Sequence, residues 1–390
     1  MRTKASVIIP TYDRAEPLSY TLRSLSQQDI EPTDFEVIVS DDGSTDRTTR
    51  TIREYGDLLN LRYVHHDDLG HRTAATRNAG AAHAASKLLI FLDSGTVAST
   101  AFVSAHLREH DTADSPLAVV GRVAGYDTGS APPASLGADL ATAGSLTSAR
   151  VRQMGLTDMR DGEVARFAGD LEAALLPWRL FWTGNCSIPT DAFREVGGFD
   201  ERFIGWGVED VDLGYRLSRA GSRLKWSVEA LAIEYPHERV ASANAENNYR
   251  NHRLFLESHL DPEIELFIAA RRSNVNVHDA AVEYRAWTAD LPPFGPPSET
   301  RDISSFIGRH AVFGPVRRKY DDVLITPRTT DHGSWRRSIG LHTRLPPGIF
   351  AAAHISAFYR PIWSRWREEI LAEARRVASH VTLDPELDAR

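Results

Sequence analysis

Short apolar runs that end in polar loops, separated by stretches with helical spacing, constrain the fold of this chain more than any other feature. The clearest runs are Ala5–Tyr12, Phe35–Ser40, Leu61–His65 and Lys87–Asp93. Apolar runs of this length without polar alternation are typical of strands buried on both faces of a parallel sheet. Because such strands are joined by right-handed crossovers, the pattern predicts an α/β domain with a mostly parallel central sheet flanked by helices.

Two of these runs end in carboxylates that are placed to hold a ligand. The second run leads into Ser40–Asp46, and the fourth ends on Asp93, which is followed by Ser94 and Gly95. Open α/β sheets bind ligands at the carboxyl ends of their strands, so a nucleotide or a metal is expected there. Turn chemistry alone would also explain the Asp-Gly-Ser sequence, and a plain turn is the alternative for Asp93.

The densest group of acidic residues, Glu209, Asp210 and Asp212, lies at the start of a segment with helical spacing. The first turn of a helix favours anions, so an acidic helix N-terminus that only caps itself is one interpretation. Trp182 and Trp206 favour another, because exposed indoles beside carboxylates form a platform for a sugar ring. Residues two apart on a helix point about 200° apart, so Asp210 and Asp212 cannot both face one substrate.

The length of 390 residues predicts two parts, a catalytic domain over 1–240 and a mainly helical C-terminal region over 241–390. A proline cluster at 291–297 is interpreted as a linker within the second part. The segments with helical patterns in that part are 248–259, 261–272 and 361–379.

Two segments stand outside this pattern. Residues 112–170 give no assignable strands or helices, and the glycines and prolines between Gly125 and Gly137 predict a long loop or lid. Residues 303–367 hold 11 Lys and Arg against 3 Asp and Glu, in a chain whose formal net charge is −8. This basic segment is interpreted either as a solvated face or as a surface for an anionic acceptor, a membrane or a partner.

The single cysteine, Cys186, excludes an intrachain disulfide and a cysteine-built zinc site. The N-terminal residues lead into a strand pattern without a signal-peptide core, and no apolar run approaches the ~20 residues that span a bilayer. We therefore expect a cytoplasmic protein with no transmembrane segment and no nucleic-acid partner. Core packing is one role for Trp363 and Trp366, and peripheral membrane contact is the alternative.

Five motifs, in order, carry a resemblance to a known family. They are Val7–Arg14, Val39–Asp46, Ala75–Gly80, Ile90–Asp93 and Gly205–Leu213. Together they resemble the inverting family 2 glycosyltransferases. The last motif, with the Trp-Thr-Gly-Asn-Cys-Ser sequence before it, also resembles the acceptor half of galactosyl- and polypeptide N-acetylgalactosaminyl-transferases. The resemblance covers the region before the C-terminal third and implies the GT-A fold of nucleotide-diphospho-sugar transferases.

This resemblance implies roles for individual residues. Pro10, Thr11 and Asp42 would hold the base and ribose of the nucleotide, and Arg77 would contact the base or the diphosphate. Asp210 would be the general base, because the family's base is the aspartate that follows the glutamate of the Gly-Trp-Gly-x-Glu-Asp motif. The residues expected to bind the acceptor are Trp182, Asn185, Trp206 and Glu209.

The resemblance also implies a divalent metal. Asp93 matches the first aspartate of the family's Asp-x-Asp motif, whereas Gly95 stands where the second aspartate is usual. A downstream histidine binds the metal in related enzymes, and His237 occupies that place. Mn²⁺ or Mg²⁺ is therefore expected at Asp93 and His237, with diphosphate oxygens completing the shell.

The expected function is inverting transfer of a hexosyl or N-acetylhexosaminyl group from a nucleotide-diphosphate donor, with a UDP-sugar favoured. The acceptor would belong to natural-product, peptide or surface-glycan biosynthesis. A nucleotidyltransferase is one alternative, although the glycine-rich phosphate loop of such enzymes is absent from Pro10–Arg14. A non-catalytic module that binds a nucleotide sugar is the other, and Gly95 motivates it.

Overall fold

The computed structural model describes residues 3–125 and 146–235, most of 247–282 with gaps, and short helical and strand segments between 324 and 385. The chain divides into two compact units, Met1–Asn251 and His252–Arg390. The boundary therefore falls about ten residues after the one expected from the sequence. His237 and the proline cluster at 291–297 lie outside the described residues.

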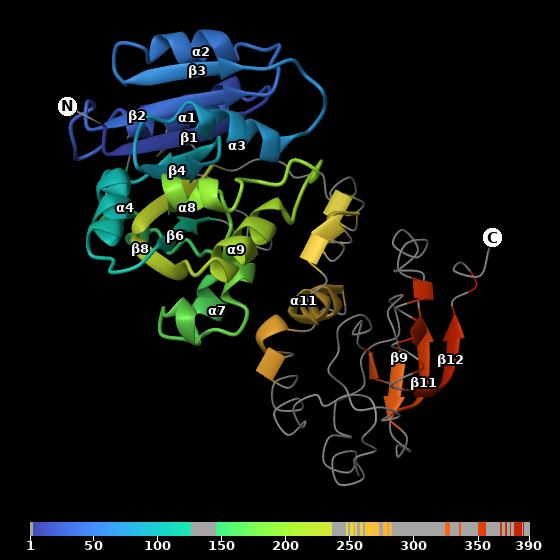
Figure 1. Ribbon diagram of the computed structural model, residues 1–390. Helices are drawn as coiled ribbons and strands as arrows, with labels where there is room; N and C mark the ends of the chain where they lie inside the picture. The colour runs from blue at the N-terminus through green and yellow to red at the C-terminus, as the bar shows by residue number, and fades with distance from the viewer. Residues whose placement is uncertain are drawn as a thin grey trace. The chain divides into compact units, whose positions relative to one another are not determined.

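The first unit is built on an eight-stranded sheet with the order β3-β2-β1-β4-β7-β6-β8-β5 (Figure 1). Its strands are β1 (Ala5–Thr11), β2 (Phe35–Asp41), β3 (Leu61–His65), β4 (Leu88–Leu92), β5 (Thr96–Ala98), β6 (Leu117–Ala124), β7 (Asn185–Pro189) and β8 (Arg223–Glu234). The β1–β2, β1–β4, β2–β3 and β6–β8 pairs are parallel. The β4–β7, β6–β7 and β5–β8 pairs are antiparallel, so the complete sheet is mixed.

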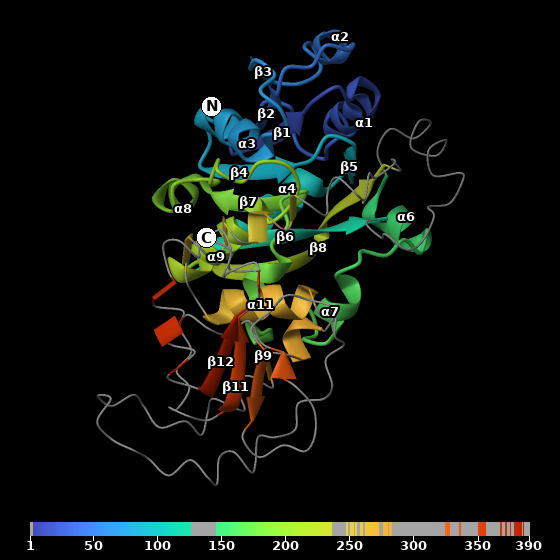
Figure 2. The same cartoon turned by 90° about the vertical axis from the view of Figure 1, so that its right-hand side faces the viewer.

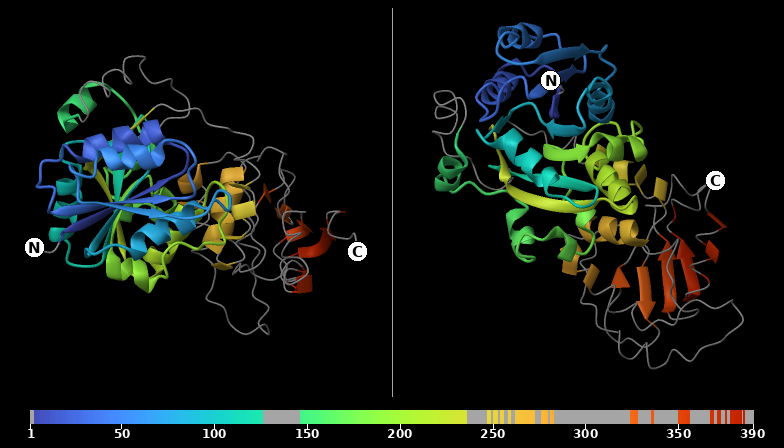
Figure 3. Two further views of the ribbon diagram at one scale, coloured as in Figure 1. Left: turned by 90° about the horizontal axis from the view of Figure 1, so that it is seen from above. Right: turned by 60° about the vertical axis from the view of Figure 1, so that its left-hand side comes forward.

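Apolar side chains on both faces explain why β1, β2 and β4 are interior strands of the sheet. All residues of these three strands are buried. On one face, Leu18 and Leu22 of α1 (Ala15–Leu25) pack in a common core with strand residues such as Val7. On the other face, α3 (Thr73–Ala82) approaches so closely that a Cβ on Gly80 would lie 2.6 Å from Ile8 Cγ2. Helices accordingly cover both faces of the sheet (Figure 3).

The remaining helical segments of the first unit join the strands or follow them. They are α2 (Thr48–Glu54), α4 (Phe102–Asp111), α6 (Ser148–Gln153), α7 (Asp161–Ala165), η1 (Leu171–Ala173), η2 (Pro177–Leu180), α8 (Thr190–Glu195) and α9 (Glu209–Arg219). None of the helices within the described ranges is both long and apolar enough to cross a membrane.

The four strands and the acidic helix predicted from the sequence are confirmed. β7 begins at Asn185, after a 3-10 turn over Pro177–Leu180. β6 lies inside the segment 112–170, whose local pattern predicts neither strand nor helix. The loop or lid expected between Gly125 and Gly137 falls almost entirely outside the described residues.

The second unit contains α11 (Pro262–Arg272) and a four-stranded sheet with the order β10-β9-β11-β12 (Figure 1). Its strands are β9 (Leu324–Pro327), β10 (Trp335–Arg336), β11 (Phe350–Ile355) and β12 (Ala378–Leu383). The helix expected at 261–272 is confirmed, and the described part of this unit also contains a sheet that the sequence did not predict. The alanines of β11 are weak strand formers, and pairing with β9 and β12 overrides that local preference.

A buried polar group lies between α4 and β7. His106 contacts the side chains of Asn185 and Ser187 at 2.9 and 2.8 Å, and His110 contacts the same serine at 2.8 Å. Burial lowers the pKa of His106 to about 3 and that of His110 to about 4. Both imidazoles are therefore neutral hydrogen-bonding groups of the core at neutral pH.

We predict that these histidines make the fold sensitive to acid. The unfolded chain binds a proton at each histidine below pH 6.5, while the folded chain does not until about pH 3 to 4, so stability falls as the pH drops through this window. Between pH 6 and 4.5, the slope of the free energy of unfolding against pH should be smaller in His106→Gln than in the wild type. The difference should correspond to about one bound proton. Urea unfolding at stepped pH measures this slope.

The control for this prediction is His83→Gln, because His83 is an exposed histidine at the end of α3. Its pH slope should match that of the wild type. An unchanged slope in His106→Gln would show that this histidine does not drive the acid sensitivity.

Candidate functional site

Arg77 joins three elements at the carboxyl edge of the sheet. It lies on α3, and its guanidinium contacts Asp93 Oδ1 at 2.8 Å, directly after β4, and Glu209 Oε1 at 3.1 Å, at the start of α9. Its Cζ atom also lies 5.5 Å from the ring centre of Phe199. Burial alone would lower the pKa of Arg77, but the charges of Asp93 and Glu209 outweigh it and raise this pKa above the ordinary arginine value.

The three carboxylates of α9 have different environments. Asp212 is fully buried and accepts from Arg216 at 2.7 and 2.8 Å, so it serves an ion pair within the helix. Glu209 uses Oε1 for Arg77, while its buried Oε2 has no hydrogen-bond partner among the described residues. Asp210 is half-buried and accepts only from the backbone N–H of Val211, at 2.7 Å, among the hydrogen bonds of the described part. Asp210 and Glu209 therefore each keep a carboxylate oxygen without a partner among the described residues, and that of the half-buried Asp210 is on the more accessible residue.

The electrostatics of the site set the protonation of Asp210. Burial, followed by the negative charge of Glu209, raises the pKa of Asp210 to about 7, while the positive charge of Arg77 acts in the opposite direction. A carboxylate with a pKa near the working pH is suited to general base catalysis, because it accepts a proton and releases it again.

Backbone strain marks the start of α9. Val208 precedes Glu209 and has φ +80, a left-handed conformation that a β-branched residue rarely adopts. The preceding Gly205 and Gly207 also have positive φ, and the Gly205 N–H donates to the carbonyl of His71 at 2.9 Å. Strain of this kind persists only where the surroundings hold it, and it is concentrated at functional sites.

The residues expected to bind the nucleotide lie at the carboxyl ends of β1 and β2. Pro10 and Thr11 are buried in β1, and the Thr11 hydroxyl lies 3.4 Å from Ser94 Oγ. Asp42 follows β2 and accepts from the guanidinium of Arg72 at 3.0 Å. Since β1, β2 and β4 are parallel neighbours, these residues share one sheet edge with Asp93.

The structure separates the residues expected to bind the acceptor. Trp206 is 43% exposed, in the loop before α9, and Glu209 offers its free oxygen. Asn185 is fully buried, and its side chain bonds His106 at 2.9 Å and the carbonyl of Ala230 at 2.8 Å. This placement gives Asn185 a role in the core rather than at the acceptor, because the amide is already used within the sheet.

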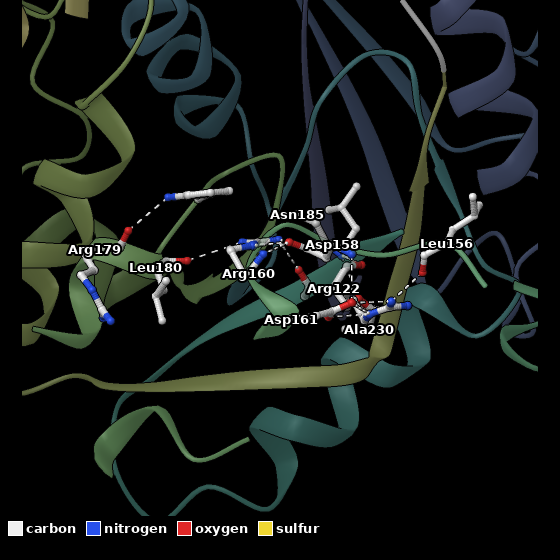
Figure 4. A network of polar contacts seen from close by, with 12 residues as sticks. Arg122, Leu156, Asp158, Arg160, Asp161, Arg179, Leu180, Asn185 and Ala230 are labelled. Atoms are coloured by element: carbon white, nitrogen blue, oxygen red, sulfur yellow. Dashed lines mark hydrogen bonds and ion pairs between the residues drawn. The ribbon is translucent and has the colours of Figure 1, made fainter. Parts of the chain in front are cut away.

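Trp182 is held by residues that the sequence did not single out. The guanidinium of Arg160 lies 4.7 Å from the Trp182 ring centre and 4.8 Å from that of Trp226, and it pairs with Asp158 at 2.7 Å. Figure 4 shows Arg160 and Asp158 within a wider network that includes Arg122. Its charged members Arg122, Asp158 and Arg160 lie in the segment 112–170, whose local pattern carries no signal for such a network.

Thr183 is a second residue that the sequence left unassigned. Its hydroxyl is buried without a hydrogen-bond partner in the described part of the chain. The next residue, Gly184, lies so close to Asp93 that a Cβ there would be 3.3 Å from Oδ2. The position of Thr183 directly after Trp182, in the stretch that resembles an acceptor-binding motif, was the signal available for it.

Of the two residues expected to bind a metal, only Asp93 lies among the described residues. The carboxylate of Asp93 is paired with Arg77, and Gly95 offers no ligand. Within the described ranges, no group of three or more His, Cys, Asp or Glu side chains is arranged to hold a metal ion. The other expected ligand, His237, lies outside those ranges.

Comparison with known proteins identifies the family. The model of glycosyl transferase family 2 matches residues 6–162, and that of the N-terminal domain of galactosyltransferase matches residues 171–239. The chain is 36% identical to a validoxylamine A glucosyltransferase of Streptomyces hygroscopicus subsp. limoneus, over 98% of this chain and 90% of that protein. It is 31% identical to a chondroitin synthase of Escherichia coli, over 61% of this chain and 35% of that protein.

The fold agrees with this assignment. The crystal structure of S. aureus TarS 1-349 in complex with UDP-GlcNAc superposes with a TM-score of 0.50 at 20% identity. The match covers 78% of this chain and 81% of TarS 1-349. The Glu209–Asp210 pair, the Arg77 bridge and the two family matches lead to one conclusion: this chain belongs to the family 2 glycosyltransferases, with a GT-A fold.

Proposed function

We propose that this glycosyltransferase moves a hexosyl group from a UDP-sugar to a hydroxyl of a small natural-product acceptor, with inversion at the anomeric carbon. The proposal rests on the position of Asp210, whose half-buried carboxylate lies at the start of α9, next to the Glu209 side chain that pairs with Arg77. The acceptor class is supported by the relative that glucosylates validoxylamine A, because the match includes both units of the chain.

In this proposal Asp210 and Arg77 have different roles in the reaction. The Asp210 carboxylate takes the proton from the acceptor hydroxyl as its oxygen attacks the anomeric carbon of the donor. The bond from that carbon to the diphosphate breaks on the opposite face, and the diphosphate leaves with the electron pair. Arg77 supplies positive charge on the donor side through its place beside Asp93. One catalytic carboxylate is sufficient, unlike the pair that glycosidases use.

The free oxygen of Glu209 supports a role in binding an acceptor hydroxyl, and the exposed ring of Trp206 supports stacking on a sugar-like ring. Use of Mn²⁺ or Mg²⁺ through Asp93 and His237 stays a prediction from the sequence, and no step of the proposal depends on it. A cytoplasmic location is also part of the proposal, supported by Cys186, a buried free thiol and the only cysteine of the chain.

The proposal is tested with a panel of nucleotide sugars. UDP-glucose, UDP-N-acetylglucosamine, GDP-mannose and dTDP-glucose are each incubated with the full-length protein, with and without validoxylamine A as acceptor. We expect UDP-sugars to release UDP, and an acceptor to accelerate the release. Formation of pyrophosphate would indicate a nucleotidyltransferase, and binding without turnover of any donor would indicate a non-catalytic module.

We predict that Asp210→Asn lowers kcat by about 10²- to 10⁴-fold, the usual contribution of a general base, with the affinity for the donor nearly unchanged. Rate and UDP-sugar binding are measured on one folded preparation. Asp191→Asn is the matched control, because Asp191 is an exposed carboxylate in the first turn of α8. A turnover within a few-fold of the wild type in Asp210→Asn would remove this residue from the role of base.

The pH profile provides an independent prediction. Because the active form of Asp210 is the carboxylate and its pKa is about 7, kcat/KM should rise with pH and level off above this value. Glu209→Gln removes a neighbouring negative charge, so the acid limb of the profile should move to lower pH. An acid limb that stays in place in Glu209→Gln would mean that another group titrates.

A further inference from the structure

The guanidinium of Arg14 lies beside Gly95. Gly95 has φ +96, and a Cβ at this position would lie 3.2 Å from Pro17 Cβ and 3.5 Å from a terminal nitrogen of Arg14. A side chain at position 95 would therefore point at the start of α1. Figure 2 shows α1 beside β5, the strand that begins directly after Gly95. A guanidinium thus lies next to the position where the family usually has its second aspartate.

Arg14 is a free cation in this environment. It precedes α1 and is partly exposed, and its guanidinium has no hydrogen-bond or ion-pair partner within the described part of the protein. Three carboxylates line the same hollow as Arg14, and each accepts a hydrogen bond from another group. Glu16 accepts from the hydroxyl of Tyr20 at 3.3 Å. Asp13 accepts from the backbone N–H groups of Thr45 and Asp46, and Asp46 accepts from that of Ala15. Arg14 therefore keeps its full capacity to bind an anion.

The local shape leaves room for such an anion. Arg14 lines a hollow of about 500 Å³ together with a second arginine, Arg47, and with the carboxylates of Asp13, Glu16 and Asp46. Arg77 cannot easily take a second anion, because its two terminal nitrogens already contact Asp93 and Glu209. The described residues thus contain one uncommitted guanidinium beside the Asp93–Gly95 turn, and its chemistry matches a phosphate, which arginine binds through parallel N–H donors.

We propose that Arg14 binds the diphosphate of the nucleotide donor, on the side of Asp93 where position 95 has no carboxylate. This inference rests on the proposed function, since it requires a nucleoside diphosphate as leaving group. Arg14 supplies positive charge that stabilises the departing diphosphate, and it does so without a ligand at position 95. The absence of a side chain at Gly95 is then a requirement, because a carboxylate there would pair with Arg14 and compete with the phosphate.

The test compares UDP with uridine as probes, in calorimetric titrations of the full-length protein with EDTA present. Arg14→Ala should weaken UDP binding by about tenfold or more, the usual loss for a hydrogen bond to a charged group. Uridine binding should not change, because uridine lacks the phosphates. Arg14→Lys should recover part of the UDP affinity, since it restores the charge without the planar fork.

Arg50→Ala is the matched control, because Arg50 is an exposed arginine on α2 that pairs only with Glu54 among the contacts described. The Arg50→Ala variant loses the same positive charge as Arg14→Ala, and its affinity for UDP should equal that of the wild type. Circular dichroism confirms that each variant is folded. Equal UDP affinity in Arg14→Ala and the wild type would overturn the inference, as would an equal loss of uridine binding in Arg14→Ala.

The same titrations with Mn²⁺ in place of EDTA separate the roles of metal and arginine. If the wild type binds UDP only with Mn²⁺, and Arg14→Ala behaves in the same way, the metal holds the diphosphate and the inference is wrong. Failure of the proposed function is recognised separately. A wild-type protein that binds none of UDP, GDP, dTDP and ADP contradicts both proposals, whereas wild-type UDP binding that Arg14→Ala leaves intact contradicts only the role of Arg14.

Discussion

The bridge from Arg77 to Asp93 and Glu209 is the interaction on which the rest of the site depends. A guanidinium that is 3% exposed is stable only with paired charges around it, and these two carboxylates come from the end of β4 and the start of α9. The bridge therefore fixes the acidic helix against the nucleotide edge of the sheet. Removing the cation would leave two carboxylates facing each other at that edge, with Asp210 close by.

The same bridge leaves the site short of positive charge. One guanidinium faces the carboxylates of Asp93, Glu209 and Asp210, and this imbalance contributes to the raised pKa of Asp210. A carboxylate with a pKa near 7 is suited to proton transfer, whereas a donor diphosphate would add further negative charge. An unpaired arginine such as Arg14, at the other end of the Asp93–Gly95 turn, balances the site when the donor arrives.

A second buried cation, Arg160, connects the regions matched by the two family models. Arg160 lies in the region matched by the family 2 model, whereas Trp182 and Trp226, the two rings beside it, lie in the region matched by the galactosyltransferase model. Asp158 is fully buried and pairs with Arg160, so neither charge is left uncompensated. The two matched regions of the first unit are thus joined by the contacts of Arg160 with two indole rings as well as by the continuous sheet.

The sequence by itself determined the elements whose signal is local. The apolar runs that became β1, β2 and β4, the acidic start of α9 and the family motifs could all be read from neighbouring residues, because burial on both faces and helix spacing leave short-range patterns. Tertiary structure decided the rest, through contacts between distant residues. Arg77 and Glu209 are 132 positions apart, Asn185 is buried only because α4 and β8 meet its amide, and Arg14 meets Gly95 through the packing of α1. The sheet of the second unit was missed for the same reason, since its alanine-rich strand β11 is stabilised by pairing with partners that no local pattern reveals.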